Sequence, residues 1–294
     1  MNRRDVLKLL GLGATGAIAM NMKLPDLKRL TDELPATAKM PAIFFGHGSP
    51  MNAVEDNSFT QKLAETGKLL EKPKAALVVS AHWLTRGTFV ATAQQPQTIY
   101  DFGGFPKELY EIVYPAKGSP ENAKLVQETV KKTIVTADGD MGLDHGAWTV
   151  LKHLWPEANV PVFQLSIDFF QSPRWHYELA QELKSLREKG IMIIGSGNIV
   201  HNLGRVNFEN PFALPDDWAS EFDETVKAKI DSHDHNALVN YLDLGKSARI
   251  AVPTNDHYLP LLYTLGLQDK EEAHSYLFEG FQNGNISMRC VKIG

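Results

Sequence analysis

Short apolar runs alternate with amphipathic segments along most of this chain, and this alternation constrains the fold more than any other feature. Apolar runs that are typical of strands lie at 41–45, 75–80, 88–92, 134–136, 160–167, 191–194 and 287–293. Segments with a helical spacing of apolar residues lie at 57–71, 120–133, 146–154, 175–189, 218–233, 236–242 and 260–265. Because strands that alternate with helices are typical of α/β proteins, the pattern predicts a single α/β domain. We expect a central, mostly parallel or mixed sheet with helices on both faces.

Four histidines each follow a short apolar run that is typical of a buried strand, at the point where the run gives way to a glycine-rich or polar loop. They are His47, His82, His201 and His257, in the segments FFGHGSP, LVVSAHW, IIGSGNIVHNL and VPTNDHY. Because α/β sheets bind ligands at the carboxyl ends of their strands, we expect these imidazoles to converge at one edge. Imidazole suits zinc, iron and copper, so the pattern predicts a metal site. A single histidine is more often a structural polar residue, and the spacing of these four matches no local metal motif.

The composition restricts the ligands of such a site. Among the 294 residues there is one cysteine, Cys290, which excludes an internal disulfide and any cysteine-rich zinc or iron–sulfur site. A metal would therefore need histidine and carboxylate ligands. Asp256 precedes His257 and is placed to orient that imidazole through a hydrogen bond. The formal net charge of −5, without a long basic run, argues against nucleic acid as a partner.

The first residues have the features of an export signal. The pair Arg3-Arg4 resembles the twin-arginine motif of exported bacterial proteins. An apolar stretch too short to span a bilayer follows, and it ends in small residues that suit a cleavage site. We expect a signal segment at 1–19, a linker at 20–39 and the folded domain at 40–294. The protein would then be periplasmic, with no stable membrane span after cleavage. The alternative is a basic amphipathic helix at the N-terminus of a cytoplasmic protein.

His145, in the segment LDHGAW, is a fifth candidate for the site. It precedes a predicted helix, whose N-terminus favours a neutral imidazole that can act as a base or donate a hydrogen bond near pH 7. The alternative is a capping loop held by Asp144. His176, at the start of another predicted helix, is the weakest candidate. The aromatic, Gly- and Pro-containing segment 94–118 is expected to form a long loop that either walls a substrate pocket or packs on the surface.

Two rival chemistries lack their motifs. A nucleophile elbow requires G-x-S-x-G, and neither GSG at 195–197 nor GHGSP at 46–50 fits that pattern. A phosphate-binding loop or a dinucleotide fingerprint requires further glycines or a lysine, and GSG at 195–197 lacks them. The motifs therefore favour neither a serine hydrolase nor a nucleotide-binding enzyme.

Seven segments resemble the 4,5-DOPA extradiol dioxygenase family, which belongs to the class III, or LigB-like, extradiol ring-cleavage dioxygenases. They are PAIFFGHGSPMN, VVSAHWLTRG, IYDFGGFPKELYEIVYPAKGSP, LDHGAW, VFQLSID, GSGNIVHNL and NDHYLPLLYTLG. The resemblance extends from about residue 40 to the C-terminus, and the segments occur in the family's order. The export segment departs from the family, whose members are mostly cytoplasmic.

The resemblance implies a metal-dependent enzyme in which non-haem Fe(II) binds a catechol, such as DOPA, through both hydroxyls. O₂ then binds, and the ring opens beside the diol. Zn²⁺ can occupy the same site. By position, His47, His82 and His257 match the metal-binding histidines. His201 matches a histidine that is either a fourth ligand or the acid/base beside the metal, and His145 matches one that hydrogen-bonds substrate or oxygen.

The expected ligand set also leaves other functions open. The usual facial triad for Fe(II) includes a carboxylate, whereas an all-histidine set has less negative charge, which favours zinc as a competitor. The alternatives are a zinc-bound hydrolase and a periplasmic metal-binding protein without turnover.

Overall fold

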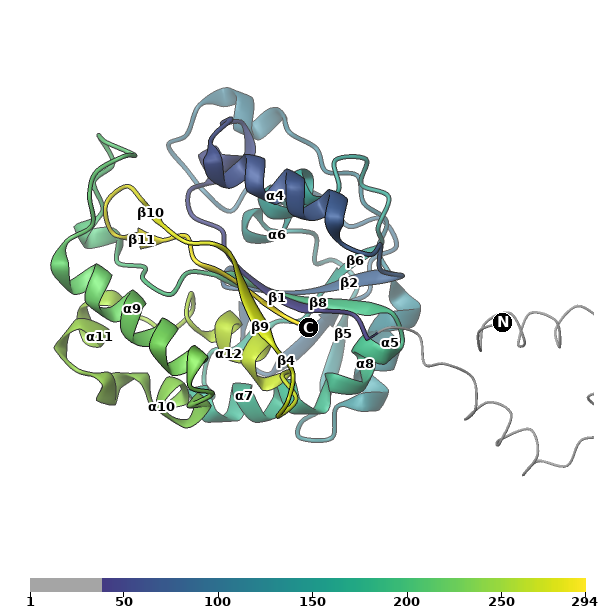
Figure 1. Ribbon diagram of the computed structural model, residues 1–294. Helices are drawn as coiled ribbons and strands as arrows, with labels where there is room; N and C mark the ends of the chain where they lie inside the picture. Colours follow the sequence, from purple (N-terminus) through teal and green to yellow (C-terminus); the bar gives the residue numbers. More distant parts are fainter. Residues whose placement is uncertain (1–38) are drawn as a thin grey trace, which may run out of the picture.

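The computed structural model describes residues 39–294, and a six-stranded mixed sheet runs through its centre (Figure 1). In spatial order the strands are β6 (Val162–Gln164), β2 (Ala75–Ser80), β8 (Ile191–Gly197), β1 (Ala42–Gly46), β12 (Cys290–Ile293) and β9 (His274–Phe278). The first four are parallel, and the last two are antiparallel to their neighbours. The prediction of a single α/β domain with a mixed sheet is confirmed. The predicted signal segment at 1–19 and the linker up to residue 38 lie outside the described residues.

The central strands β1, β2 and β8 are buried on both faces, as their continuous apolar runs predict. Along β1, Phe44 packs into one hydrophobic core and Phe45 into the other. Successive side chains of a strand point to opposite faces, so each face needs its own covering layer. The parallel register places Phe45, Ser196 and Ser80 side by side, and the three strands therefore end at one level.

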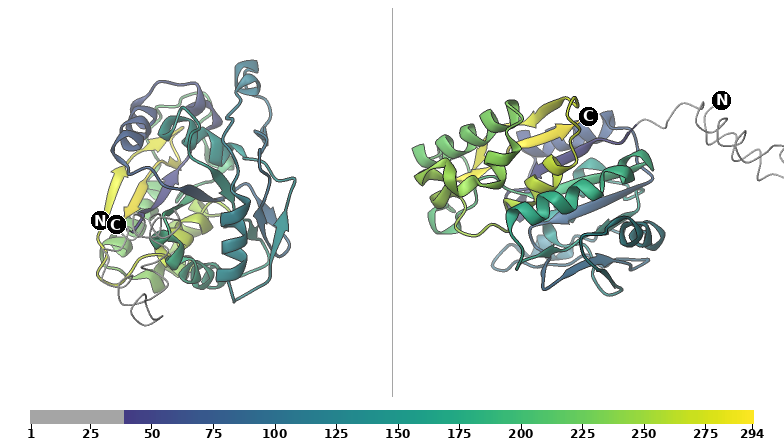
Figure 2. Two further views of the ribbon diagram at one scale, coloured as in Figure 1. Left: turned by 90° about the vertical axis from the view of Figure 1, so that its right-hand side faces the viewer. Right: turned by 90° about the horizontal axis from the view of Figure 1, so that it is seen from below.

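Helices cover both faces of the sheet, as predicted. In Figure 1, α4 (Ser58–Leu69) and α6 (His145–Leu154) lie above it. The other face is covered by helices whose buried residues share the core of Phe44, the lower core: α5 (Pro120–Thr129), α7 (Pro173–Glu182), α8 (Lys184–Glu188), α9 (Asp217–Asp231), α10 (His235–Val239), α11 (Lys246–Ala251) and α12 (Leu259–Gly266). In Figure 1, α7 and α12 lie below the sheet, and α9, α10 and α11 lie to its left and lower left. Seen from below, several of these helices lie across the sheet (Figure 2, right).

In the described part of the chain, three pairs of short strands lie outside the central sheet. They are β4 (Thr88–Ala91) with β5 (Val135–Asp138), β3 (Leu84–Thr85) with β7 (Ile167–Asp168), and β10 (Phe281–Gln282) with β11 (Ile286–Ser287). The single strand predicted at 160–167 is therefore wrong, because it is divided between β6 and β7. Residues 39–294 also contain four 3₁₀ helices: η1 (Pro50–Ala53), η2 (Lys107–Glu111), η3 (Leu203–Arg205) and η4 (Tyr241–Leu244).

The helix predicted at 175–189 is interrupted. At Leu183 the backbone N–H bonds to the carbonyls of Ala180 and Gln181, which ends α7 in a tight turn before α8 begins. The turn lets Leu183 and the following helix both pack into the lower core. Neither α11 nor β9 was predicted, because α11 is too short to show helical periodicity and β9 is only half-buried.

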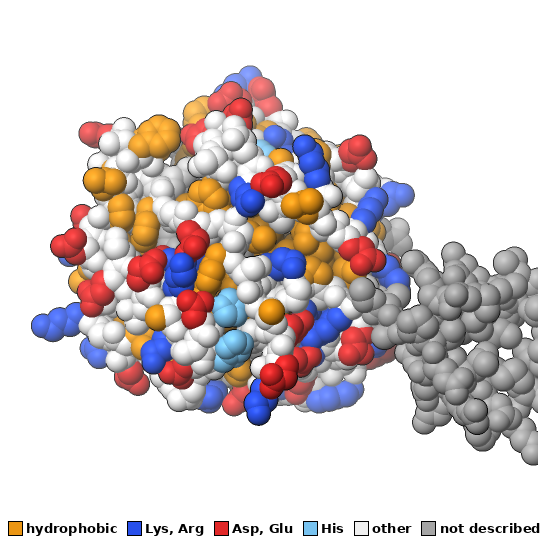
Figure 3. Space-filling view, viewed as in Figure 1, with side chains coloured by type: hydrophobic (Ala, Val, Ile, Leu, Met, Phe, Trp, Pro, Cys, Tyr) orange, Lys and Arg blue, Asp and Glu red, His pale blue; other side chains and the backbone are white. Residues whose placement is uncertain are grey.

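The surface combines charges of both signs. On the face in Figure 3, Lys and Arg side chains are interspersed with Asp and Glu, and hydrophobic side chains gather near the β10–β11 hairpin and the loop before α9. That loop exposes Phe208, Phe212 and Leu214. Within residues 39–294 there is no helix with the length and apolar character needed to cross a membrane.

Candidate metal centre and active site

Two of the predicted site histidines follow parallel strands of the central sheet. His47 directly follows β1, and His82 lies two residues after β2. Strand β8 lies between these strands, and His201 lies four residues after its end. Because the three strands end at one level, these imidazoles converge at the carboxyl edge of the sheet, as expected for a ligand site in an α/β fold.

His257 also reaches this edge, but not from a strand. The apolar run before it, predicted as a strand, is the end of helix α11 and a loop, and His257 leads into α12. The backbone of His257 is fixed by the end of β8: the N–H of Asn198 donates to its carbonyl oxygen at 2.9 Å. His257 therefore lies at the predicted edge, but the strand predicted before it is wrong. A short apolar run does not distinguish a strand from the buried end of a helix.

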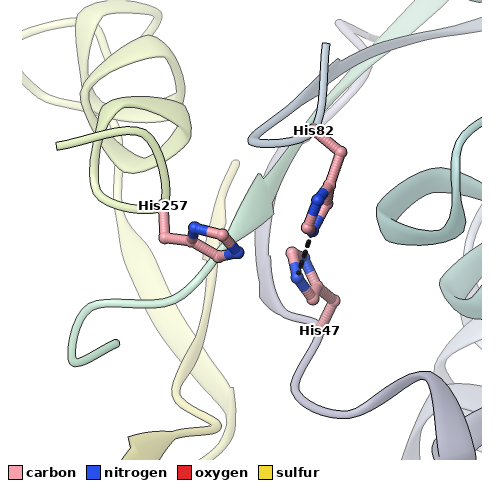
Figure 4. Close-up of side chains that lie close together, drawn as sticks. All are labelled: His47, His82 and His257. Carbon is pink, nitrogen blue, oxygen red and sulfur yellow. Dashed lines mark hydrogen bonds between the residues drawn. The ribbon is translucent and has the colours of Figure 1, made fainter. Parts of the chain in front are cut away.

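The imidazoles of His47, His82 and His257 point toward one another (Figure 4). Nε2 of His47 lies 3.2 Å from Nε2 of His82, and each of the three side chains offers a nitrogen within 4.8 Å of the other two. Two nitrogens bound to one ion at about 2.1 Å and at tetrahedral or octahedral angles lie about 3.0–3.4 Å apart. The observed separation of the two Nε2 atoms therefore fits ligands of one metal ion.

Two of these residues, His47 and His82, are held in the neutral form that metal binding requires. Burial lowers the pKa of His47 well below its ordinary value of 6.5, and the neighbouring histidines lower it further. Burial and the adjacent imidazoles also lower the pKa of His82. A neutral imidazole has a free lone pair, whereas a protonated one cannot bind a metal. As the sequence predicted, the Asp256 carboxylate accepts a hydrogen bond from Nδ1 of His257, which leaves Nε2 for the site.

His145 is the first residue of α6 and lies beside the three histidines. Its ring centroid is 3.9 Å from that of His82. Asp144 caps the helix by accepting from the N–H of Ala147, so the capping role proposed for this segment is real. The His145 side chain takes no part in this cap. Its Nδ1 is 2.7 Å from Oδ2 of Asp101, and its backbone N–H donates to Oδ1 of Asp101 at 2.8 Å. The structure thus places His145 in the site.

Asp101 is a site residue that the sequence prediction missed. Burial raises its pKa, but hydrogen bonds and charge from His145 outweigh this, so the pKa lies below its ordinary value. Oδ2 of Asp101 is also 3.3 Å from Nδ1 of His82, so one carboxylate faces two imidazoles. The sequence did contain a signal for Asp101, because it is a carboxylate within the aromatic segment 94–118 that was expected to line a substrate pocket.

His201 lies flat against His257. The ring centroids are 3.5 Å apart and the planes differ by 6°. Burial lowers the pKa of His201 to about 3, and proximity to His257 adds to this effect. A metal–nitrogen bond of about 2.1 Å lies in the plane of the imidazole ring. Two stacked rings at this separation do not direct both lone pairs at one ion. This geometry argues against His201 as a fourth ligand beside His257.

Other combinations of these side chains are also compact. Within the described residues, the sets His82–Asp101–His145 and His201–Asp256–His257 each offer three ligand atoms within 4.8 Å of one another. The centre is therefore a continuous cluster of five imidazoles and two carboxylates. His176, the weakest candidate, is not part of it; its Nδ1 lies 3.0 Å from the hydroxyl of Tyr263 in the core.

A cavity of about 620 Å³ opens above the imidazoles. Besides the five histidines, its wall includes the apolar residues Met51, Phe102, Phe105, Leu203, Phe208, Pro211 and Ile286 and the polar residues Ser49, Glu55, Asp101, Gln282 and Asn283. The cavity is large enough for a small aromatic molecule. The aromatic residues of the segment 94–118 have two different locations. Phe102 and Phe105 line the cavity, whereas Tyr114 is buried in the core that contains Phe45.

Comparison with known proteins identifies the class to which this fold and site belong. The profile described as the catalytic LigB subunit of aromatic ring-opening dioxygenase matches residues 40–288. The chain therefore belongs to the LigB family, and it is an oxidoreductase of the ring-cleaving dioxygenase class.

Named relatives are similar over nearly their whole length. The 4,5-DOPA dioxygenase extradiol of Escherichia coli K12 is 45% identical over 267 residues, which cover 90% of this chain and 98% of that protein. The 4,5-DOPA dioxygenase extradiol of Beta vulgaris is 34% identical, with 85% and 94% covered. A crystal structure of an uncharacterized Escherichia coli K12 protein superposes with a TM-score of 0.75 at 42% identity, covering 87% of this chain and all of that one.

Proposed function

We propose that this protein opens the aromatic ring of a catechol such as DOPA beside the diol, with Fe(II) held by His47, His82 and His257. The observation that carries the proposal is the convergence of three imidazoles beneath a cavity with aromatic walls. Membership of the LigB family and the names of the two relatives support the same reaction and a substrate of this class.

The donor set suits the proposed ion. Neutral imidazoles bind Fe(II) and Zn²⁺, and three of them leave coordination positions open. A bound Fe(II) would supply those positions to the two catechol oxygens and to O₂. A set of three histidines adds no charge of its own, which also makes Zn²⁺ a strong competitor for the same nitrogens.

The remaining side chains are assigned to the substrate and its protons. His201 is neutral near pH 7, and its stacking on His257 favours the role of base over that of fourth ligand. We therefore assign to it the proton that a catechol hydroxyl loses on binding. His145 is oriented through Nδ1 by Asp101, which leaves Nε2 available to hydrogen-bond substrate or oxygen. The rings of Phe102 and Phe105 exclude water and contact the aromatic ring of the substrate.

Anaerobic loading with Fe(II), followed by DOPA and then air, tests the proposal. We expect oxygen uptake together with a yellow ring-opened product, and neither from the same protein loaded with Zn²⁺. Stoichiometric Fe(II) without oxygen uptake on DOPA or catechol would contradict the proposal. In that case tight retention of Zn²⁺ would favour the hydrolase or the metal-binding protein without turnover.

We also propose that residues 1–19 direct export of the protein to the periplasm through the twin-arginine route. The supporting observation is the order of the paired arginines, the apolar stretch and the small residues. Cell fractionation should find the protein in the periplasm, and the double substitution Arg3→Lys with Arg4→Lys should retain it in the cytoplasm. A cytoplasmic wild-type protein would contradict the proposal.

A further inference from the structure

The end of β8 bonds to three of the segments that carry the site histidines. The carbonyl of Ser196 accepts from the N–H of Ala81, next to His82, at 2.9 Å, and the carbonyl of Gly197 accepts from the N–H of His47 at 3.0 Å. One residue further on, Asn198 donates to the carbonyl of His257. This short stretch therefore sets the relative positions of all three proposed ligands.

The side chain of Ser196 adds a contact to an imidazole ring. The residue is fully buried, and its Oγ lies 2.9 Å from Nδ1 of His47. The same Oγ is 2.5 Å from the carbonyl oxygen of Gly146, in the first turn of α6. A hydroxyl has one hydrogen, and a carbonyl oxygen can only accept. The hydrogen of Ser196 therefore goes to Gly146, and Ser196 Oγ accepts from an N–H at Nδ1 of His47.

This arrangement determines which nitrogen of His47 carries the lone pair. With the hydrogen on Nδ1, Nε2 is free and faces Nε2 of His82. The other tautomer would direct an N–H into the space between the imidazoles, where it would block a cation. It would also leave Nδ1 and Ser196 Oγ with two facing lone pairs in a buried place, which is costly.

We propose that Ser196 is a positioning residue that fixes the Nδ1–H tautomer of His47 and couples this ligand to the N-terminus of α6, which carries His145. The inference rests on the proposed metal site at His47, but not on ring cleavage. Partners of this kind typically change metal affinity by about 10–100-fold when they are removed.

Ser80 provides a matched control. It pairs with Ser196 across the β2–β8 ladder and is equally buried. Its Oγ donates to Asp144 at 2.6 Å, at the same helix N-terminus. Its Oγ also accepts from the backbone N–H of His82 at 3.3 Å, but in the described part of the chain no hydrogen bond joins the Ser80 side chain to an imidazole ring. Substitution of Ser80 therefore loosens α6 without touching the ring of His47.

The test uses Zn²⁺ as the probe on the full chain. We expect Ser196→Ala to weaken Zn²⁺ binding about tenfold in competition with a chelator. Ser196→Cys is nearly isosteric, but its thiol is a weak acceptor, so it should weaken binding in the same direction even if the alanine variant folds poorly. Ser80→Ala should change the affinity by less than about twofold. Equal losses in the Ser80 and Ser196 variants would reduce Ser196 to a structural role and overturn the inference.

A second readout reports the tautomer itself. Long-range proton–nitrogen NMR of the metal-free chain, with His47 assigned from the His47→Gln spectrum, should show His47 with its hydrogen on Nδ1. In Ser196→Ala the two nitrogen shifts should move toward each other, because both tautomers become populated. An unchanged Nδ1–H tautomer in that variant would refute the inference. Zn²⁺ binding and the tautomer are measured without substrate, so they remain decisive if ring cleavage is not found.

Discussion

Gly197 lies directly against the backbone of His257: a Cβ atom on this glycine would be 2.1 Å from the carbonyl oxygen of His257. The contact joins the end of a central strand to a loop sixty residues further along the chain. Glycine is required here because of the close approach, since its backbone has an ordinary conformation. The position of one proposed metal ligand therefore depends on the absence of a side chain on β8.

Gly197→Ala should displace His257 and weaken metal binding. The added methyl group must push the His257 backbone away, because the opposing atom is a carbonyl oxygen rather than the end of a flexible side chain. We expect at least a tenfold loss of Zn²⁺ affinity and a loss of stability of about 1–3 kcal/mol. Gly139→Ala is the control, since a Cβ there meets nothing closer than 4.0 Å. Unchanged Zn²⁺ affinity in Gly197→Ala would show that His257 is not a ligand.

Substitutions of His257 and His145 should separate metal binding from turnover. His257→Ala removes one of three converging nitrogens, so the purified protein should retain little metal. His145→Ala should retain metal, because Nδ1 of His145 is committed to Asp101, but kcat should fall about 100-fold or more. Metal analysis and oxygen uptake on the same samples provide the two readouts. Loss of metal from His145→Ala would show that the wrong three residues have been assigned as ligands.

The charge of the cavity predicts a preference among catechols. Glu55 lines the cavity, and no Lys or Arg is among the described residues that do so. A catechol with an ammonium group on its side chain should therefore be a better substrate than one with only a carboxylate. Glu55 is half-exposed, so Glu55→Gln should lower kcat/KM for 3,4-dihydroxyphenethylamine by only about fivefold. Unsubstituted catechol is the internal control and should be unaffected.

The core histidine His176 should make the fold sensitive to acid. Burial lowers its pKa from 6.5 to about 4, an effect that Asp168 partly offsets. The unfolded chain binds a proton at His176 more tightly than the folded chain does. The contribution of His176 to the free energy of unfolding is therefore fully present above pH 6.5. It is lost as the pH falls toward 4, and the loss amounts to about 3 kcal/mol.

Urea unfolding at several pH values measures this effect. His176→Asn should lower stability at neutral pH and reduce the loss of stability between pH 6.5 and 4. His233→Asn is the control, because His233 is exposed and has a positive φ of 56°, which asparagine tolerates. If His176→Asn leaves the pH dependence unchanged, the acid sensitivity arises from the histidines of the metal centre instead.

Much of the sheet and part of the site could be predicted from local pattern. The apolar runs of β1, β2 and β8 are continuous because both of their faces are buried, and this makes them recognisable as strands. His47 directly follows β1 and His82 lies two residues after β2, so their convergence could be predicted from the rule that parallel strands end at one edge of a sheet. The weaker patterns failed where an element was short, as with α11 before His257.

The amino-acid sequence by itself thus determined the fold class, the edge of the sheet where the site lies and the histidines that gather there. Only the tertiary structure decided how those side chains are oriented: Asp101 against His145, His201 stacked on His257, and Ser196 between His47 and Gly146. The physical reason is the distance along the sequence between the residues in contact. Hydrophobic periodicity is a property of neighbouring residues, whereas each of these contacts joins segments more than forty residues apart, whose meeting depends on strand order and loop docking.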